Sequence, residues 1–351
     1  MTGATLSNLK GVLMKNTTFA KAALAAAISF GFASQGFAAG YEKSIMWGGR
    51  TASQAGISTS YIMGADALYF NPAGLVAAAP GSQVSLNVSP VWSKFSGPYA
   101  NDNASVDSKQ GFTTPLGLIY SNTINDSWAF GVGGYISGGS KVKYEDVRIG
   151  TVPMNGSEAK TDLQVGEISA GVAYKISPMW KVGAAYRHIM AKADFSILSR
   201  AGNGPGFAVA NTKLTDLEDT KSGFKLGAQF APTESTHVGL TYRSEAKLEA
   251  EGKASRTVYS ATTGGVVAPN TDLGTTTAST VFPQAVTLGA DHAFNETWVG
   301  LAEIAWTNYS KVDKIAITGG VNSQVTQEWK DQWNARLGGE YRGFSWPIRF
   351  G

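Results

Sequence analysis

The sequence has no cysteine, and only 16% of its 351 residues are charged. The absence of cysteine excludes zinc ribbons, thiol catalysis and disulfide scaffolds. A charged fraction well below the ~25% of soluble domains argues against a coiled coil and against an ordinary soluble surface. No window holds the ~18 consecutive apolar residues that a membrane-spanning helix needs, so a helical membrane protein is also excluded.

Catalytic groups are scarce too. The three histidines, His188, His237 and His292, are scattered along the chain. No Gly-x-Ser-x-Gly elbow, His-Glu-x-x-His pair or phosphate-binding P-loop occurs. The glycine-rich stretch 202–206 lacks the spacing and the strand–helix context of a nucleotide site. We therefore expect no enzyme, no cofactor and no metal site.

The first 39 residues have the pattern of a secretory signal peptide. Two lysines precede an apolar run over 22–33, and small residues follow it. The expected start is Met14 and the expected cleavage follows Ala38 or Ala39; a short buried N-terminal helix is the alternative. Residues 1–39 carry three lysines and no acids, which leaves 26 basic and 26 acidic residues. A net charge of zero suggests no nucleic-acid partner.

The whole sequence is rich in glycine and aromatic residues, with 42 Gly, 9 Trp, 13 Tyr and 16 Phe, which argues against disorder. From residue 180 onward, apolar and polar side chains alternate with a period of two, as in strands with one apolar face. No Asp, Glu, Lys or Arg falls on the apolar face of the six clearest segments. These segments are 180–190, 222–230, 238–249, 286–294, 298–306 and 333–341.

The apolar face is predicted to point outward into lipid, although a secreted β-sandwich would show the same alternation with that face inward. Trp298 and Trp306 lie eight residues apart on one face, as do Trp333 and Tyr341. Eight residues span about 26 Å of strand. The rings would then sit near the two edges of an apolar band about 25 Å tall, where aromatic girdles occur. The predicted fold is all-β, a transmembrane antiparallel β-barrel.

The connections between the expected strands alternate between short turns and long loops, as in outer-membrane barrels. The expected strands are 84–95, 115–122, 128–136, 163–175, 180–190, 222–230, 237–249, 285–294, 298–307 and 332–342. The expected long loops are 96–114, 137–162, 199–221, 251–283 and 308–331. An eleventh strand begins at Pro347 and stops at Gly351. Because bacterial barrels have an even number of strands and closed walls, the barrel 82–351 is expected to be incomplete at its C-terminus.

Residues 40–81 lack the period of two. The stretch 65–70 predicts a short helix, and Asn71-Pro72 is expected to end it, because a residue before proline is biased away from the helical conformation. A compact apolar segment before a barrel is either a periplasmic peptide or a plug folded into the lumen.

The same residues carry a resemblance. Asp66-Ala-Leu-Tyr-Phe-Asn-Pro-Ala-Gly-Leu75, preceded by Ala52-Ser-Gln-Ala-Gly56, resembles the N-terminal hatch signature of the FadL/TodX family. Phe282-Pro283, Ala305-Trp-Thr307 and the segment 329–341 follow in the family's order, so the resemblance covers about 40–351. It implies an outer-membrane transporter of long-chain fatty acids and other hydrophobic compounds. The implied fold is a barrel of about 14 strands, in keeping with the even strand numbers of bacterial barrels. The hatch plugs the lumen of this barrel.

The resemblance also implies passive uptake by a monomer in the bacterial outer membrane, a rearrangement of the hatch and lateral release through the wall. It places the hatch gate at Asn71, Pro72, Ala73 and Gly74. Substrate-binding candidates are hatch residues and cations expected to face the lumen, where they would meet a fatty-acid carboxylate: Leu68, Tyr69, Phe70, Arg187, Lys225, Arg243, Lys247 and Arg336. Alternatively, these cations pair with acids expected on the same wall, namely Glu245, Glu249, Asp291, Glu303 and Glu340. The gate residues would then only end a helix, and Leu68, Tyr69 and Phe70 would only pack the plug. A kinked wall strand is suggested by Gly131, Gly133, Gly134, Gly138 and Gly139, although the same glycines would also fit the girth of the barrel.

The sequence does not distinguish fatty acids from aromatic hydrocarbons as cargo. The expected partners are a hydrophobic ligand and the surrounding lipid or detergent. A general diffusion porin, in which 40–81 is not a plug, is one alternative function. A surface adhesin that uses the long loops is another, and an outer-membrane hydrolase is the third.

Overall fold

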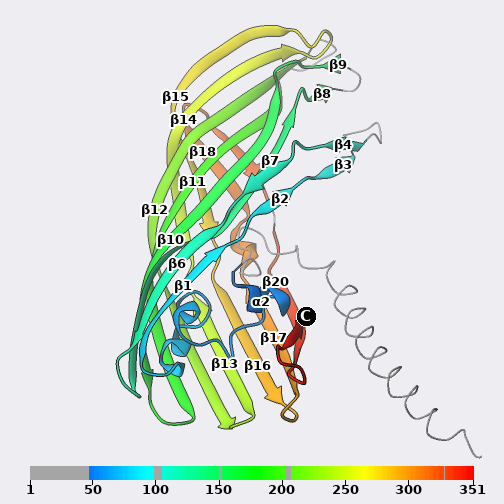
Figure 1. The fold of residues 1–351 in the computed structure, drawn as a ribbon. Coiled ribbons are helices and arrows are strands. Elements are labelled where there is room, and N and C mark those ends of the chain that lie inside the picture. Colours follow the sequence, from blue (N-terminus) through cyan, green and yellow to red (C-terminus); the bar gives the residue numbers. More distant parts are fainter. Residues whose placement is uncertain (1–46, 99–104, 150–151, 202–206, 328) are drawn as a thin grey trace, which may run out of the picture.

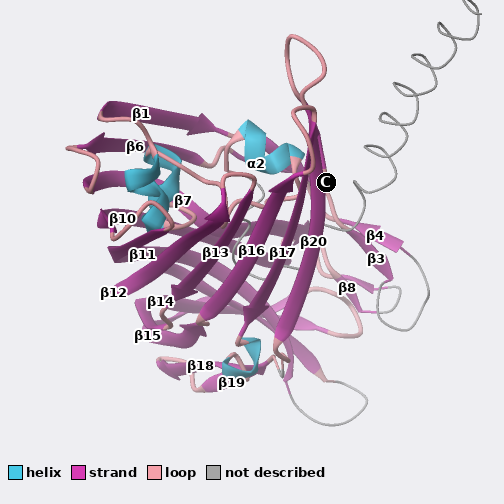
Figure 2. Cartoon of the chain, turned by 90° about the horizontal axis from the view of Figure 1, so that it is seen from below, coloured by secondary structure: helices cyan, strands magenta, loops and turns pink. Residues whose placement is uncertain are grey.

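The computed structural model describes residues 47–98, 105–149, 152–201, 207–327 and 329–351, so the expected signal peptide lies outside the described residues. The described chain forms a curved, 15-stranded antiparallel sheet, with the N-terminal segment on its concave side (Figures 1 and 2). None of the helices in these ranges is long and apolar enough to cross a membrane.

The N-terminal segment contains three short helical turns, α2 (Gly49–Ser53), η2 (Ala65–Leu68) and η3 (Pro72–Ala77). The main strands are β1 (Gly81–Val88), β6 (Leu116–Thr123), β7 (Trp128–Glu145), β10 (Glu158–Lys175), β11 (Trp180–Ala201), β12 (Ala208–Thr233), β13 (Thr236–Arg243), β14 (Ala246–Ser260), β15 (Val266–Phe282), β16 (Ala285–Ala293), β17 (Trp298–Thr307), β18 (Lys314–Gly319), β19 (Ser323–Thr326), β20 (Gln332–Tyr341) and β21 (Ile348–Phe350). Three small hairpins join β2 (Val91–Ser93) to β5 (Gly111–Thr113), β3 (Ser96–Pro98) to β4 (Ser105–Asp107), and β8 (Arg148–Ile149) to β9 (Val152–Pro153). A short helical turn, η4 (Tyr309–Lys311), follows β17.

The path of the wall runs β1-β6-β7-β10-β11-β12-β13-β16-β17-β20-β21. Each neighbouring pair is antiparallel, and the short turns, such as 124–127 and 176–179, lie together at one end of the sheet (Figure 1). Within the described ranges, β1 and β21 have a paired strand on one side only. The predicted number of strands therefore stays a prediction.

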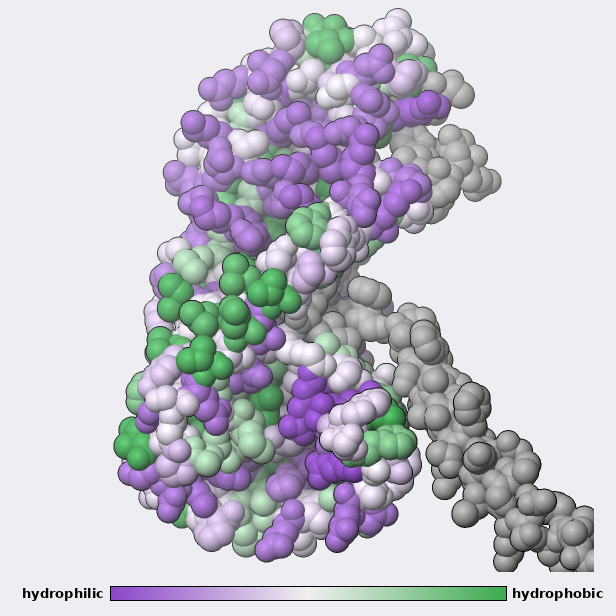
Figure 3. All heavy atoms as spheres, in the orientation of Figure 1, coloured by the Kyte–Doolittle hydropathy of each residue, from purple (hydrophilic) through white to green (hydrophobic). Residues whose placement is uncertain are grey.

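The predicted orientation of the strands is confirmed. Large apolar side chains such as Ile168, Leu240 and Leu337 are exposed on the outer face, whereas Glu167 and Glu303 are buried on the inner face. In Figure 3, hydrophobic side chains gather over the lower half of the molecule and hydrophilic ones over the upper extension. Apolar side chains on the outside and polar side chains on the inside are the reverse of the arrangement in a soluble protein, and a wall that faces lipid requires this arrangement.

The aromatic girdle is present at both levels. Trp298 pairs across the strands with Tyr341, with ring centroids 4.7 Å apart, and Trp306 pairs with Trp333 at 6.5 Å. Trp298 is 44% exposed and Trp333 is 68% exposed, so the rings point away from the centre of the sheet. Aromatic pairs in register across strands add to sheet stability as well as marking the membrane edges.

The prediction that 137–162, 199–221 and 251–283 are long loops is wrong. Most of these residues extend the strands, and β14 and β15 form a long arm that curves above the rest of the wall (Figure 1). The prediction rested on the loss of clean alternation. The pattern changes here because the outer face of the extension is polar and its inner face becomes apolar, as at Leu217 and Ala250, whereas the backbone ladder continues across it.

The single strand predicted over 237–249 is also wrong, because the chain divides it into β13 and β14. The amide of Ser244 donates to the carbonyl of Phe224, and the amide of Phe224 donates in return to Ser244 Oγ at 2.9 Å. The ladder breaks at 244–245, and β14 then pairs with the upper part of β12 and with β15. The break reverses which side chains face inward, so Leu248 is buried whereas Lys247 and Glu249 are exposed.

Candidate functional site

The N-terminal segment packs on the inner face of the wall. Leu68 and Leu75 are fully buried, in one apolar cluster with Ile119 of β6 and Ala173 of β10. Trp47 stacks on Tyr69, with ring centroids 4.9 Å apart and nearly parallel planes. The predicted short helix is confirmed as η2, and the segment is a compact body inside the curve of the sheet (Figure 2).

Asn71 lies at the centre of this segment and is completely buried. Its Oδ1 accepts the amide of Ala73 at 3.2 Å and caps η3, so the Asn-Pro pair begins a second helical turn as well as following the first. Its Nδ2 donates to the carbonyl of Thr59 at 2.7 Å and to the carbonyl of Ala228 in β12 at 3.1 Å. One side chain therefore joins both halves of the segment to the wall.

Side chains from the wall bond to the backbone of the segment at further points. Glu303 Oε2 accepts the amides of Ser58 and Thr59, each at 3.1 Å. Lys225 Nζ donates to the carbonyl of Tyr69, and Gln229 Nε2 donates to the carbonyl of Ile62 at 2.9 Å. Because charged groups make the stronger hydrogen bonds, Glu303 and Lys225 are the main polar attachments.

Glycines let the segment approach the wall closely. Gly183, Gly227 and Gly239 lie on the inner face of β11, β12 and β13. A Cβ atom on any of them would overlap atoms of the segment: the carbonyl carbon of Pro72, Asn71 Oδ1 and the carbonyl oxygen of Thr59, respectively. Contact between two backbones at this distance leaves room for no other residue type.

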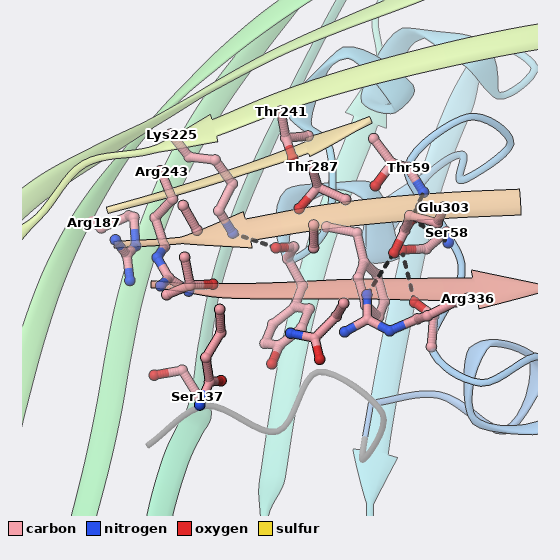
Figure 4. A pocket seen from close by; sticks show the side chains of 18 of the residues that line it. Ser58, Thr59, Ser137, Arg187, Lys225, Thr241, Arg243, Thr287, Glu303 and Arg336 are labelled. Atoms are coloured by element: carbon pink, nitrogen blue, oxygen red, sulfur yellow. Dashed lines mark hydrogen bonds and ion pairs between the residues drawn. The ribbon is translucent and has the colours of Figure 1, made fainter. Parts of the chain in front are cut away.

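A cavity of about 130 Å³ lies between the segment and the wall. Tyr69 and Phe70 of the segment line it, and Ser58 and Thr59 lie opposite wall side chains such as Arg336 (Figure 4). Burial raises the pKa of the Tyr69 hydroxyl well above its ordinary value, and Glu167 adds to the rise, so this ring stays neutral. The acidic and basic side chains of the wall that line the cavity are Glu167, Arg187, Lys225, Arg243, Glu303 and Arg336.

Two of the four cations pair with the two carboxylates. Arg187 donates to Glu167 in a bidentate pair, with distances of 2.9 and 2.7 Å. Arg336 Nη1 donates to Glu303 Oε1 at 2.8 Å. Arg243 Nη2 donates to the carbonyl of Pro283 at 3.0 Å. The cavity therefore has more cations than carboxylates, and its charge suits an anionic group.

The structure brings together most of the predicted site residues. Tyr69, Phe70, Arg187, Lys225, Arg243 and Arg336 line the cavity, whereas Leu68 packs in the core below it. The prediction that Lys247 and Glu249 face the lumen is wrong, because the break at 244–245 turns both outward. The expected pairing of these cations with the expected acids is found at Arg336 and Glu303. Arg187 pairs with Glu167 instead, and Glu340 pairs with Arg342 and Arg349.

Sequence reasoning missed Glu167, Tyr135 and Gln229. Tyr135 donates to Ser169 or accepts from it at 2.9 Å, beside the Glu167–Arg187 pair. The alternation of apolar and polar residues predicts that polar side chains share one face of each strand. Nothing in the sequence indicates which of these polar positions lie at the same height as the N-terminal segment.

Two further hollows flank the cavity. Above it, the inner face becomes apolar, and a pocket is lined by Leu163, Ala191, Ala193, Phe195, Leu217, Leu248, Ala250, Ala278, Thr280, Phe282 and Ile315. Beside it, a hollow of about 280 Å³ lies between the β2–β5 hairpin and residues 136–141 of β7. There the pairing of β7 with β10 shifts register, so that Ser137 is an extra residue between Ile136 and Gly138.

A lipid-facing antiparallel wall with a compact segment inside it defines a membrane β-barrel protein with an occupied interior. The family model of the outer membrane protein transport proteins (OMPP1/FadL/TodX) matches residues 23–351. The chain belongs to this family, and its fold is that of an outer-membrane β-barrel.

The chain is similar to proteins with transport names. It is 23% identical to a long-chain fatty acid transport protein of Shigella flexneri over 261 residues. The matched region is 65% of this chain and 58% of that protein. It resembles the crystal structure of the Pseudomonas putida toluene transporter TodX with a TM-score of 0.72 and 22% identity, over 85% of this chain and 80% of that one. It also resembles a Pseudomonas aeruginosa FadL homologue with a TM-score of 0.67 and 16% identity, over 86% and 78% of the two chains. The chain spans 58% of the length of the curated relative it matches.

Proposed function

We propose that this protein is a passive uptake channel for hydrophobic compounds, in which the segment 40–81 is the hatch that closes the lumen. The observation that carries the proposal is the described part of that segment. It lies inside the wall, directly below a cavity, and wall side chains hold its backbone through Glu303, Lys225 and Gln229. The gate is assigned to Asn71, Pro72, Ala73 and Gly74. No bond is made or broken, so the activity needs neither catalysis nor a cofactor.

The proposed route begins at the apolar pocket above the cavity. Transfer of an apolar chain from water to this surface is favourable, and Leu163, Phe195 and Leu248 supply it. The ligand then moves down to the cavity, where its binding favours one state of the hatch over another. Since the transport is passive, only such differential binding changes the hatch.

Long-chain fatty acids fit this cavity better than neutral hydrocarbons do. Arg187, Lys225, Arg243 and Arg336 line it with only two carboxylates beside them, and a guanidinium binds a carboxylate well. Tyr69 and Phe70 supply an apolar floor for the chain next to the charged group. The Pseudomonas putida structure carries the name of a toluene transporter, so a hydrocarbon is the second candidate.

Lateral release is proposed at the hollow between the β2–β5 hairpin and β7. The bulge at Ser137 interrupts the pairing, and Gly138 and Gly139 line the hollow. Gly139 has a positive φ of 158°, at the edge of extended backbone, and a Cβ there would meet the carbonyl of Leu163 at 2.5 Å. The pairing of the wall is therefore interrupted beside the cavity, and a ligand would pass into the membrane there.

The test is uptake of labelled oleate and of labelled toluene in a deletion strain that carries the gene on a plasmid. Pro72→Ala and a deletion of 68–74 should lower uptake while barrel assembly, measured as heat-modifiable gel mobility, stays intact. Normal uptake of both compounds without the protein would contradict the proposal. A wide, steady conductance in planar bilayers would favour a diffusion porin, and loss of gel mobility in the variants would make the segment structural only. Cross-linking in membranes tests the proposed monomer.

A further inference from the structure

Glu303 holds the hatch and a cavity cation at the same time. Its Oε2 accepts the amides of Ser58 and Thr59, and its Oε1 accepts Arg336 Nη1 at 2.8 Å (Figure 4). The Glu303 side chain is 2% exposed, whereas that of Arg336 is 20% exposed. All four residues line the cavity. A ligand in the cavity can therefore reach Arg336 while the carboxylate behind it supports the hatch.

A chain of hydrogen bonds continues from this carboxylate to the hatch gate. Thr59, whose amide Glu303 binds, also accepts Asn71 Nδ2 at its carbonyl at 2.7 Å. Asn71 in turn caps Ala73 and bonds to the wall at Ala228. The cavity and the Asn-Pro-Ala turn are thus joined through three consecutive contacts, each between buried groups of the segment or the wall.

The geometry points to Glu303 and Arg336 as a latch that couples an anionic ligand in the cavity to release of the hatch. This inference rests on the proposed function. A ligand carboxylate bound to Arg336 would compete with Glu303 for the Arg336 guanidinium. It would also place a second negative charge beside the Glu303 carboxylate. Like charges repel strongly where water is largely excluded. Arg336 and Glu303 are positioning residues, because they act on the hatch rather than on the chemistry of the cargo.

When Glu303 moves away, the amides of Ser58 and Thr59 lose their acceptor. Buried N–H groups without a partner destabilise the state that contains them, so the docked hatch becomes less favourable once the anion is bound. A neutral ligand leaves the Arg336–Glu303 pair intact. It therefore has no means of favouring the released hatch through this contact.

The sequence contains no cysteine, so Ser58→Cys introduces a single thiol at a position that is 2% exposed. Glu303 binds the amide of Ser58, which this substitution keeps. The rate at which a water-soluble thiol reagent modifies the purified protein in detergent reports release of the hatch. Oleate should raise the rate about tenfold or more, within the range of measured coupling between sites. Oleyl alcohol, which has a neutral head on the same chain, should leave it within about twofold.

Arg336→Met in the Ser58→Cys background should raise the rate without any ligand and abolish the response to oleate. The matched control is Arg256→Met, which removes an arginine of β14 that bonds to Thr212 Oγ1 at 3.1 Å. It should keep the rate and response of the parent. Heat-modifiable gel mobility shows that each variant has assembled.

Binding of oleate, measured by displacement of a fluorescent fatty acid, separates the outcomes. Bound oleate with an unchanged rate overturns the latch but leaves the proposed function standing. A parental rate in Arg336→Met, or equal acceleration by oleyl alcohol, also overturns the latch. Failure of oleate to bind overturns the proposal that fatty acids are the cargo, and with it the ligand assigned to the latch.

Discussion

Asn71 illustrates how much of the site depends on single side chains. Its carbonyl oxygen caps η3, while its amide group donates to Thr59 and to Ala228 of the wall. Buried and fully bonded, it gives the turn one orientation relative to β12. A residue with an acceptor but no donor keeps the cap and loses the attachment to the wall.

Asn71→Asp is therefore expected to impair uptake nearly as much as Asn71→Ala. Aspartate retains the cap but makes neither donor bond, and it adds a buried charge beside two carbonyl groups. We expect a loss of at least about 2 kcal/mol in hatch docking, from the two hydrogen bonds. Oleate uptake and heat-modifiable mobility measure the two effects. Parental uptake by Asn71→Asp would show that the cap alone is needed.

Lys225 and Lys247 form a matched pair for testing the cavity. Lys225 donates to the carbonyl of Tyr69 and lies 5.4 Å from the centre of its ring, whereas Lys247 faces outward. Lys225→Met should reduce oleate uptake about tenfold or more, as expected when a charge-assisted bond of about 1.5–3 kcal/mol is lost. Lys247→Met should leave uptake unchanged. Equal effects of the two substitutions would mean that the inward position of Lys225 is irrelevant.

The error at Lys247 shows where residue-level prediction stops. Strict alternation assigned Arg243 and Lys247 to one face, and the assignment is right up to Arg243. A two-residue break at Ser244 then reverses the faces. The break depends on a hydroxyl that replaces a backbone partner, and serine is too common in strands for this to be read from the sequence. Glu303 was assigned to the right face and its expected pairing with a cation is found at Arg336, but its bonds to the amides of Ser58 and Thr59 were not predicted.

At the scale of the elements, the strands form the wall and also the surface on which the N-terminal segment packs. Gly171, Gly183, Gly227 and Gly239, on four successive strands of the wall, lie against the N-terminal segment. The predicted strands 163–175, 180–190, 222–230 and 237–249 contain these glycines, although the last divides into β13 and β14, and the Trp and Tyr positions fixed their orientation. The glycines were counted but not placed, because their common level arises only from the registers between strands, which alternation does not reveal.

Gly227→Ala should displace the hatch, because the new methyl group would overlap Asn71 Oδ1. Gly134→Ala is the control, since its nearest neighbour would be 3.8 Å away. We expect Gly227→Ala to increase channel conductance in planar bilayers without ligand, and Gly134→Ala to match the parent. Equally low conductance of both variants would show that the hatch tolerates an added methyl group at position 227.

For the whole molecule, the central feature is the orientation of the sheet: its apolar face points toward lipid and its polar face toward the N-terminal segment. On β17, Ala302 and Ile304 are exposed, whereas Leu301 and Ala305 are buried against the interior. Family membership and the fold of the structural relatives agree with this orientation. The predicted strand number and the identity of the cargo depend on features that alternation and composition do not encode.

The most direct test is nitroxide scanning along β17 in lipid bilayers, with one cysteine at a time in a chain that has none. Collisions with oxygen, which partitions into lipid, and with a water-soluble nickel chelate are measured at Leu301, Ala302, Ile304 and Ala305. The account predicts high oxygen accessibility at Ala302 and Ile304 and low accessibility to oxygen at Leu301 and Ala305. High oxygen accessibility at Leu301 and Ala305, with Ala302 and Ile304 shielded, would contradict it.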